Sequence, residues 1–170
     1  MKKKKTGAAA RLVCALLLLA GFGWYENDTL QITQQTVASA LLPESFRGFR
    51  VAVLADLHGR EFGAYNSQLL SAVKKQRPDL VALCGDLCDR GGEISRLEPL
   101  LKGLCALAPV VYVTGNHEWA MTKAERQALF SLLDACGVTR LRNDCLVLPK
   151  GGQSIVVAGV ADPNGPADQK

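Results

Sequence analysis

The sequence lacks several features that would assign a small protein to a class at once. Its six cysteines form no C-x-x-C pair and no spacing typical of a disulfide framework. They therefore predict neither a C-x-x-C site nor a set of disulfides. Aromatic residues make up only 6% of the chain, yet 48% of its 170 residues are hydrophobic and 21% are charged. This composition predicts one globular domain with a sizeable core.

Positive charge is also scarce once the N-terminus is set aside. The formal net charge is +4, but residues 2–5 and Arg11 supply five positive charges before the first acidic residue, Glu26. The remainder of the chain holds 15 basic and 16 acidic residues, a net charge of −1. We therefore expect no nucleic-acid partner for the folded part.

The first 25 residues predict attachment to a membrane. Four lysines precede an apolar run from Leu12 to Trp24, and the stretch from Gly7 to Tyr25 approaches the ~20 residues of a membrane span if Arg11 snorkels. No A-x-A cleavage site follows the leucines, which favours an uncleaved anchor over a signal peptide. The lysines favour a cytoplasmic N-terminus, so we expect a cell-membrane protein whose remaining chain is extracytoplasmic. A buried helix is the alternative.

Beyond this segment, apolar runs and helical patterns alternate, which predicts an α/β fold with a parallel sheet. Three continuous apolar runs are typical of strands buried on both faces. The predicted elements, in order, are a strand and turn over residues 30–43, a buried strand within 49–59, a helix over 65–76, a buried strand within 79–86, a helix over 94–107, a buried strand within 109–118, a helix over 122–137 and a hairpin over 145–160. Thr122 is the expected N-cap of the last helix, and Gly151 and Gly152 are expected to form the hairpin turn.

Each of the three buried strands ends in a polar cluster: D-L-H-G, G-D-L-C-D-R or G-N-H-E. Asp56, Asp86 and Asn116 follow one another at intervals of 30 residues, about one βαβ unit. Because ligands of such sheets bind beyond the carboxyl ends of the strands, we expect these residues side by side on one edge. The mixture of carboxylate, imidazole and amide groups suits Mn, Fe or Zn, and suits a pair of ions. The six candidate residues are Asp56, His58, Asp86, Asp89, Asn116 and His117.

The stretch L-C-G-D-L-C-D-R-G-G offers two competing sets of metal ligands, thiolates and carboxylates. We favour the carboxylates, because Asp and His recur at the other strand ends and Cys does not. Most of the cysteines are then expected to act as small core residues. Taken one at a time, the Asp, Asn and His residues could equally be caps, turn residues or loop residues, and only the coincidence of three clusters favours a metal site.

The motifs D-L-H at Asp56–His58, G-D-L-C-D-R at Gly85–Arg90 and G-N-H-E at Gly115–Glu118 resemble, in this order, the calcineurin-like metallophosphoesterase family. The N-terminal anchor and the stretch L-P-E-S-F-R-G-F-R-V-A-V-L-A-D-L-H-G look most similar to its membrane-anchored branch, related to hydrolases of UDP-2,3-diacylglucosamine. The resemblance runs from about Asn27 to Asp162. It implies the N-terminal half of an αββα sandwich, preceded by a hydrophobic N-terminal helix.

The resemblance also implies an organisation and a set of roles. Residues 1–25 would form the anchor, 26–48 a lead-in strand and linker, and 49–170 the phosphoesterase domain. Two divalent ions, Mn, Fe or Zn, would activate a hydroxide that attacks phosphorus in line. The implied substrate is a phosphoester or pyrophosphate, either a phosphorylated small molecule or a lipid-linked compound close to the membrane. The implied roles are Asp56 and His58 on one metal, Asp86 bridging both, Asn116 on the second, His117 as the catalytic histidine, Asp89 orienting it, and Arg90 touching phosphate.

One departure from the family is expected to matter. Family members supply a further metal-binding histidine and a G-H-x-H motif, whereas this chain contains only His58 and His117. The second metal would keep only Asp86 and Asn116 as ligands. The strand S-I-V-V-A-G-V would also leave an aggregation-prone edge near the C-terminus. We therefore expect a C-terminally truncated domain, and the alternative to an active enzyme is an inactive fragment that binds metal weakly or acts as an interaction module.

Overall fold

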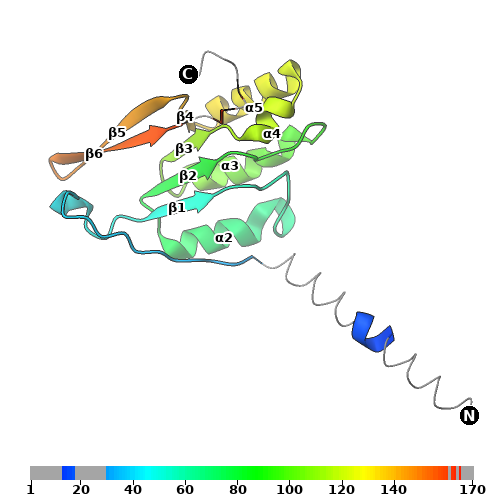
Figure 1. Cartoon of the computed structure of the whole chain (residues 1–170), viewed down its shortest axis with the longest axis horizontal. Helices are drawn as coiled ribbons and strands as arrows, with labels where there is room; N and C mark the ends of the chain where they lie inside the picture. The colour runs from blue at the N-terminus through cyan, green and yellow to red at the C-terminus, as the bar shows by residue number, and fades with distance from the viewer. Residues whose placement is uncertain (1–12, 18–29, 161, 164, 166–170) are drawn as a thin grey trace, which may run out of the picture. The chain divides into compact units, whose positions relative to one another are not determined.

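The computed structural model describes residues 13–17, 30–160, 162–163 and 165 (Figure 1). The chain divides into two compact units, Met1–Gln35 and Thr36–Lys170. In the first unit residues 13–17 are helical, and the rest of the predicted membrane segment lies outside the described residues. Within the described part of the chain, no helix has the length and apolar character needed to cross a membrane.

The second unit is built on a four-stranded parallel sheet whose strands follow one another in chain order. The strands are β1 (Val51–Leu54), β2 (Leu80–Cys84), β3 (Val110–Val113) and β4 (Thr139–Arg140). Leu54 lies opposite Leu83, and Leu83 lies opposite Tyr112, so the first three strands end close to the same level. The parallel sheet predicted from the three apolar runs is therefore confirmed.

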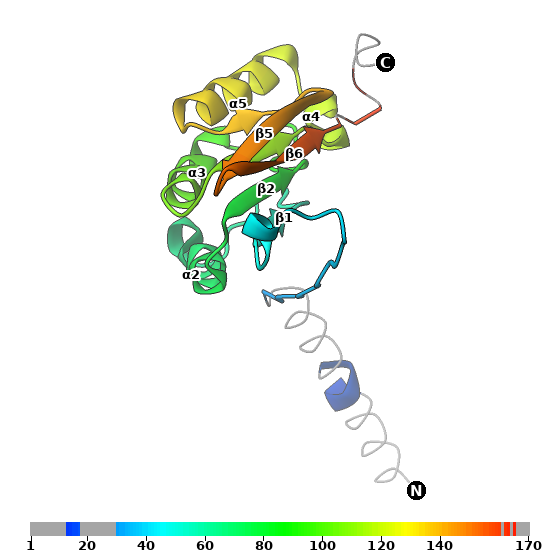
Figure 2. The same ribbon diagram turned by 90° about the vertical axis from the view of Figure 1, so that its left-hand side faces the viewer.

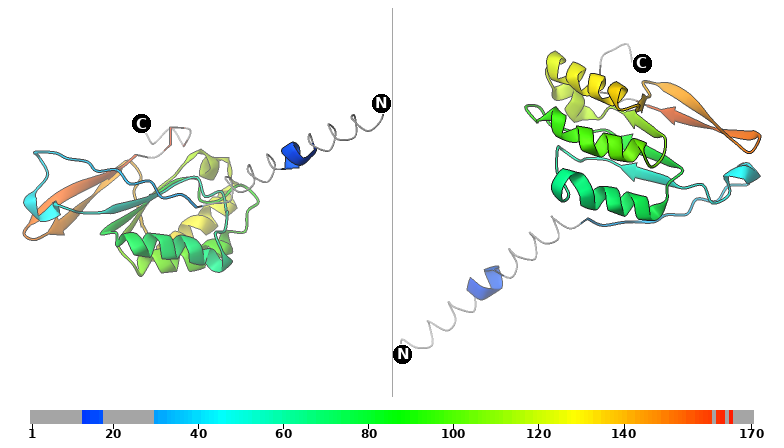
Figure 3. Two further views of the ribbon diagram at one scale, coloured as in Figure 1. Left: turned by 90° about the horizontal axis from the view of Figure 1, so that it is seen from below. Right: turned by 180° about the vertical axis from the view of Figure 1, so that it is seen from behind.

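The connections between the strands are helical, as predicted. They contain η2 (Ala64–Asn66) with α2 (Ser67–Gln76), η3 (Ile94–Leu97) with α3 (Glu98–Cys105), and α4 (Asn116–Ala120) with α5 (Lys123–Ala135). The three longer helices, α2, α3 and α5, lie on one face of the sheet (Figure 3). The short helix α4 was not predicted, because five residues are too few to show a helical period.

Local chemistry explains where the longest helix begins. Thr122 is the N-cap of α5, as predicted, and its hydroxyl accepts a hydrogen bond from the Glu125 N–H at 3.2 Å. The Glu125 carboxylate in turn accepts from the Thr122 N–H at 2.7 Å, which completes a capping box. Further along the helix, Leu129 and Leu133 are fully buried. They form the apolar stripe that packs α5 against the sheet.

The predicted hairpin consists of β5 (Asp144–Lys150) and β6 (Gln153–Gly159). Gly151 and Gly152 both have positive φ, 57° and 77°, which suits the tight turn of a two-residue hairpin. The hairpin lies over the sheet face opposite the helices (Figure 2), and its apolar side chains pack against that face. This contact joins Leu146, Leu148 and Val157 of the hairpin to Leu80, Val111 and Leu141. The sheet thus lies between helices on one side and a hairpin on the other.

Three predictions about this part of the chain were wrong. Residues 30–39 form no strand, because alternation alone does not supply a hydrogen-bonding neighbour, and Val37 is 84% exposed. The strand β1 is not buried on both faces: Val51 and Val53 are 48% and 65% exposed, since β1 lies at the edge of the described sheet. Core packing of most cysteines is also wrong, because among the described cysteines only Cys88 is buried and Cys84 is exposed.

Candidate metal site

The three polar clusters meet beyond the carboxyl ends of β1, β2 and β3, as the parallel register requires. The loops are joined by main-chain hydrogen bonds, from the Asp56 N–H to the Gly85 carbonyl at 3.3 Å and from the His58 N–H to the Asp86 carbonyl at 2.8 Å. Asp56, His58 and Asp86 all have φ near +50°, in the left-handed region that costs a residue other than glycine ~1–3 kcal/mol. Such strain persists only where the surrounding contacts hold it, and here it gathers at one edge of the sheet.

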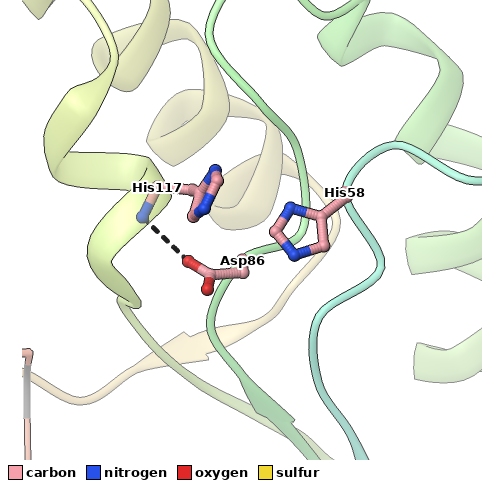
Figure 4. Close-up of side chains that lie close together, drawn as sticks. All are labelled: His58, Asp86 and His117. Carbon is pink, nitrogen blue, oxygen red and sulfur yellow. Dashed lines mark hydrogen bonds between the residues drawn. The ribbon is translucent and has the colours of Figure 1, made fainter.

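Two glycines allow the ends of β2 and β3 to approach each other. A Cβ atom on Gly85 would lie 2.5 Å from the Gly115 nitrogen, and Gly85 has φ +79°. A Cβ atom on Gly115 would collide with Oδ1 of Asp86. The same Oδ1 accepts a hydrogen bond from the His117 N–H at 2.9 Å (Figure 4). The glycines of G-D and G-N-H therefore set the distance between the Asp86 carboxylate and the start of α4.

Glu118 joins the loop after β2 to the loop after β3. Its side chain is 0% exposed, and its carboxylate accepts three main-chain hydrogen bonds. The Asp86 and Gly115 N–H groups donate to Oε2 at 2.9 and 2.8 Å, and the Leu87 N–H donates to Oε1 at 2.8 Å. One buried carboxylate thus ties the loop after β2 to the loop after β3. Sequence reasoning assigned Glu118 no role, although it is the last residue of the G-N-H-E motif.

Three side chains in these loops can share one metal ion. His58, Asp86 and His117 each offer one ligand atom, and these atoms lie within 4.8 Å of one another (Figure 4). Asp86 is buried, His117 is half-buried and His58 is exposed, so the group opens to solvent on one side. One carboxylate and two imidazoles suit Zn, Mn or Fe. The described residues therefore fit a divalent metal of the predicted kind, and the group contains no cysteine.

Asp89 fixes both histidine rings. Its Oδ1 atom lies 2.8 Å from Nδ1 of His58 and 2.6 Å from Nδ1 of His117. The hydrogen bond from His58, and that from His117, lower the pKa of Asp89 despite some desolvation, so the group is an ionised carboxylate that can only accept. Both Nδ1 atoms must then carry the proton. The free ring nitrogen of each imidazole is Nε2, the atom available to a metal or a substrate.

The same carboxylates act on the charge of His58. The hydrogen bond to Asp89 raises the pKa of His58 above its ordinary value, against a smaller effect of desolvation, and the nearby charges of Asp86 and Asp56 raise it further. A metal-free His58 therefore keeps its proton to a higher pH than an isolated imidazole. A metal ion that binds Nε2 has to displace the proton that this atom carries in the charged ring. The affinity of the site for metal therefore depends on pH.

The structure brings His58, Asp86, Asp89 and His117 together. Asp56 is exposed and is not one of the three grouped ligands, although its charge reaches His58. Asn116 is the exposed first residue of α4, and Arg90 is exposed. The ligand roles of Asp56 and Asn116, and the phosphate contact of Arg90, stay predictions.

Comparisons with known proteins identify relatives of this chain. The sequence profile of the family described as calcineurin-like phosphoesterase matches residues 49–164. The transmembrane protein with metallophosphoesterase domain of Danio rerio is 35% identical over 147 residues, 81% of this chain and 33% of that protein. YpbG of Bacillus subtilis is 32% identical over 64% of this chain and 40% of its own length. The metallophosphoesterase YkuE of the same bacterium is 27% identical over 87% of this chain and 54% of its own. The chain thus spans between a third and about half of the length of these relatives.

Proposed function

Because the chain belongs to the calcineurin-like phosphoesterase family, we propose that it hydrolyses a phosphoester or pyrophosphate bond with the help of divalent metal ions. The observation that carries this proposal is the convergence of His58, Asp86 and His117 within 4.8 Å, at the sheet edge where such folds bind ligands. A nucleophilic cysteine mechanism has less support, since burial raises the pKa of Cys88 and so keeps it a thiol.

The proposed chemistry divides between the metals and the chain. When bound, the ions polarise the phosphoryl oxygens and lower the pKa of an attacking water. Asp86 and His58 each hold a ligand atom in a fixed position. The main-chain contacts of its loop hold Asp86, and the hydrogen bond to Asp89 holds His58. His117 carries a proton at Nε2 toward the leaving group, and Asp89 holds the ring by its Nδ1–H and stabilises the imidazolium.

We further propose two ions. Asp56 and His58 bind the first, Asp86 is shared, and Asn116 binds the second. From this chain the second ion has only Asp86 and Asn116, so we expect weaker binding there. The alternative to the catalytic role of His117 is that it serves as the third ligand of a single ion. This alternative is supported by its ligand atom, which lies within 4.8 Å of those of His58 and Asp86.

The proposed substrate lies close to a membrane. Support comes from the lysine cluster and apolar run in residues 2–24, and from the name of the Danio rerio relative, a transmembrane protein. We propose a single N-terminal anchor, a catalytic domain on the extracytoplasmic side, and a phosphorylated small molecule or lipid-linked compound as substrate. The relation to hydrolases of UDP-2,3-diacylglucosamine is part of this proposal.

The test is hydrolysis of p-nitrophenyl phosphate and bis-p-nitrophenyl phosphate by the full chain in detergent micelles with added Mn²⁺. We expect activity that falls ~100-fold or more in Asp86→Asn, because that change removes a metal ligand. Asp144→Asn, an exposed carboxylate on the hairpin, is the matched control and should keep full activity. Folded protein that binds Mn²⁺ and hydrolyses neither compound would instead support an inactive metal-binding domain.

A further inference from the structure

The turn that carries Asp89 is attached to α5 by one side chain. The Gly92 N–H donates to the Asp89 carbonyl at 2.9 Å, which closes a turn over residues 89–92. Within this turn the Gly91 N–H donates to Oε1 of Glu125 at 2.9 Å. Glu125 belongs to the first turn of α5 and lies 34 positions further along the chain. The contact thus holds the Asp89 turn from outside the loop after β2.

The two carboxylate oxygens of Glu125 make different contacts. Oε2 accepts from the N–H and the hydroxyl of Thr122 at 2.7 and 2.6 Å, within the capping box of α5, and Oε1 accepts from Gly91. The hydrogen bonds from Thr122, followed by that from Gly91, lower the pKa of Glu125 despite some desolvation. The ionised carboxylate can accept at both oxygens at once. The capping box uses only one of them, so the contact with Gly91 is not needed to begin the helix.

Arg126, the next residue of α5, contacts the other half of the site. Its Nη1 atom donates to the carbonyls of Glu118 and Met121 at 3.4 and 3.3 Å. Its guanidinium carbon also lies 4.9 Å from the centre of the Trp119 ring. Both carbonyls and the ring belong to α4 or directly follow it, and α4 carries His117. Consecutive residues of α5 therefore contact the loop after β2 and the helix after β3.

The contact between Asp89 and His117 joins these two segments. Oδ1 of Asp89 lies 2.6 Å from Nδ1 of His117, and the two side chains are 49% and 42% exposed, so burial does not fix their distance. The hydrogen bonds from the loop after β2 to Glu118 end at the Leu87 N–H, two residues before Asp89. An error of ~1 Å in the position of a catalytic group can cost ~100-fold in rate. The contact therefore needs an attachment beyond Leu87, and the bond from the turn to Glu125 supplies one.

We propose that Glu125 is a positioning residue, which sets the place of Asp89 relative to His117 by holding the turn over residues 89–92 on α5. Arg126 holds α4 on the same helix, so α5 is the common support of both partners. The kinetic consequence rests on the proposed function, in which Asp89 orients His117 toward the leaving group. The geometric consequence does not, because it concerns only which nitrogen of His117 carries a proton.

The variant Glu125→Gln separates the two contacts of this side chain. Glutamine can replace glutamate in a capping box, so its oxygen can stay with Thr122, and its NH₂ group then faces the Gly91 N–H. Thr122→Ala is the matched control, because it removes the hydroxyl of the cap and leaves Oε1 of Glu125 with Gly91. If Glu125 acted only as a cap, Thr122→Ala would change the site as much as Glu125→Gln does.

The first measurement is the ¹⁵N NMR spectrum of the histidine rings in the metal-free full chain in micelles, with EDTA, at a pH where both rings are neutral. The chain has only two histidines, so each ring can be assigned separately. Asp89 should keep the proton of His117 on Nδ1 in the unmodified chain and in Thr122→Ala. In Glu125→Gln the ratio of Nδ1–H to Nε2–H in His117 should fall ~10-fold, because its hydrogen bond to a charged group is weakened.

The second measurement is hydrolysis of p-nitrophenyl phosphate with saturating Mn²⁺. In Glu125→Gln kcat should fall ~10-fold while KM changes less than ~2-fold, since His117 acts on the leaving group in the transition state. Thr122→Ala should keep both constants. In an Asp89→Asn background Glu125→Gln should have no further effect on kcat, because it acts through Asp89.

The proposal is overturned if Glu125→Gln leaves the proton ratio of His117 unchanged, or if Thr122→Ala changes that ratio equally. It is also overturned if the rate losses of Glu125→Gln and Asp89→Asn add in the double variant. If the unmodified chain hydrolyses nothing, the proposed function fails, and the ring spectrum alone decides the role of Glu125. Glu125→Asp, which is one methylene shorter and cannot reach both Thr122 and Gly91, replaces Glu125→Gln if that variant does not fold.

Discussion

Replacing Glu118 by glutamine should loosen the whole metal site while changing only one atom. The carboxylate now accepts from three main-chain N–H groups, two on Oε2 and one on Oε1. The best orientation of the amide keeps its oxygen near the Asp86 and Gly115 N–H groups. Its NH₂ group then faces the Leu87 N–H, so a donor meets a donor in a fully buried place.

The cost follows from these contacts. One buried N–H without an acceptor costs ~1–3 kcal/mol, and the two remaining bonds lose the charge that made them about twice as strong as neutral ones. We expect a loss of about 3 kcal/mol in the free energy of unfolding, within the ~5–15 kcal/mol of a typical domain. Glu118→Ala would strand all three N–H groups and is expected not to fold.

Urea unfolding of the metal-free full chain in micelles measures this loss. With a slope of ~1.5 kcal/mol/M, the midpoint of Glu118→Gln should fall by about 2 M. Glu93→Gln is the control, because Glu93 is an exposed residue that pairs with Arg96 on the surface, and its midpoint should not move. A shift in Glu118→Gln equivalent to less than ~0.5 kcal/mol would refute the argument, since it would mean that the three N–H groups do not depend on this carboxylate.

Three other expectations follow from the same loops and from α5. Gly115→Ala should abolish Mn²⁺ binding measured by calorimetry, because the new methyl group collides with Oδ1 of Asp86; unchanged affinity would contradict the close approach. Mn²⁺ affinity should fall up to ~10-fold per pH unit as pH drops through the raised pKa of His58, and in Asp89→Asn the fall should begin at a lower pH; an identical profile would show that Asp89 does not set the charge of His58. Thr122→Ala should cost ~1 kcal/mol in urea unfolding by removing the cap of α5, and no change would mean that the capping box is dispensable.

The sequence predicted the parts of this fold that depend on neighbours in the chain. Thr122 and Glu125 mark the start of α5 within four residues, and the glycine pair marks the hairpin turn. The site was predictable for a related reason: parallel strands of similar length bring their ends together, so clusters 30 residues apart had to meet. Local patterns and one topological rule were enough for both.

What the sequence could not predict depends on partners far along the chain. Glu118 contacts main-chain groups 31 and 32 residues away, and nothing in its local pattern shows them. The apolar run of β1 shows that it fits a strand, but not that it lies at an edge where Val53 is exposed. Asp89 was expected to orient His117 alone, whereas it contacts both histidines, because that depends on how two loops approach each other in space.

The short helix α4 explains why these features occur together. Three successive residues of α4 have different neighbours: His117 lies beside Asp86 and His58 (Figure 4), Glu118 accepts hydrogen bonds from the loops after β2 and β3, and Trp119 lies under the guanidinium group of Arg126. A shift of α4 that improves one of these contacts must change the other two, because five helical residues cannot bend independently of one another. The three main-chain hydrogen bonds accepted by the buried Glu118 carboxylate oppose such a shift, so His117 should keep its place beside Asp86 only as long as those bonds are intact.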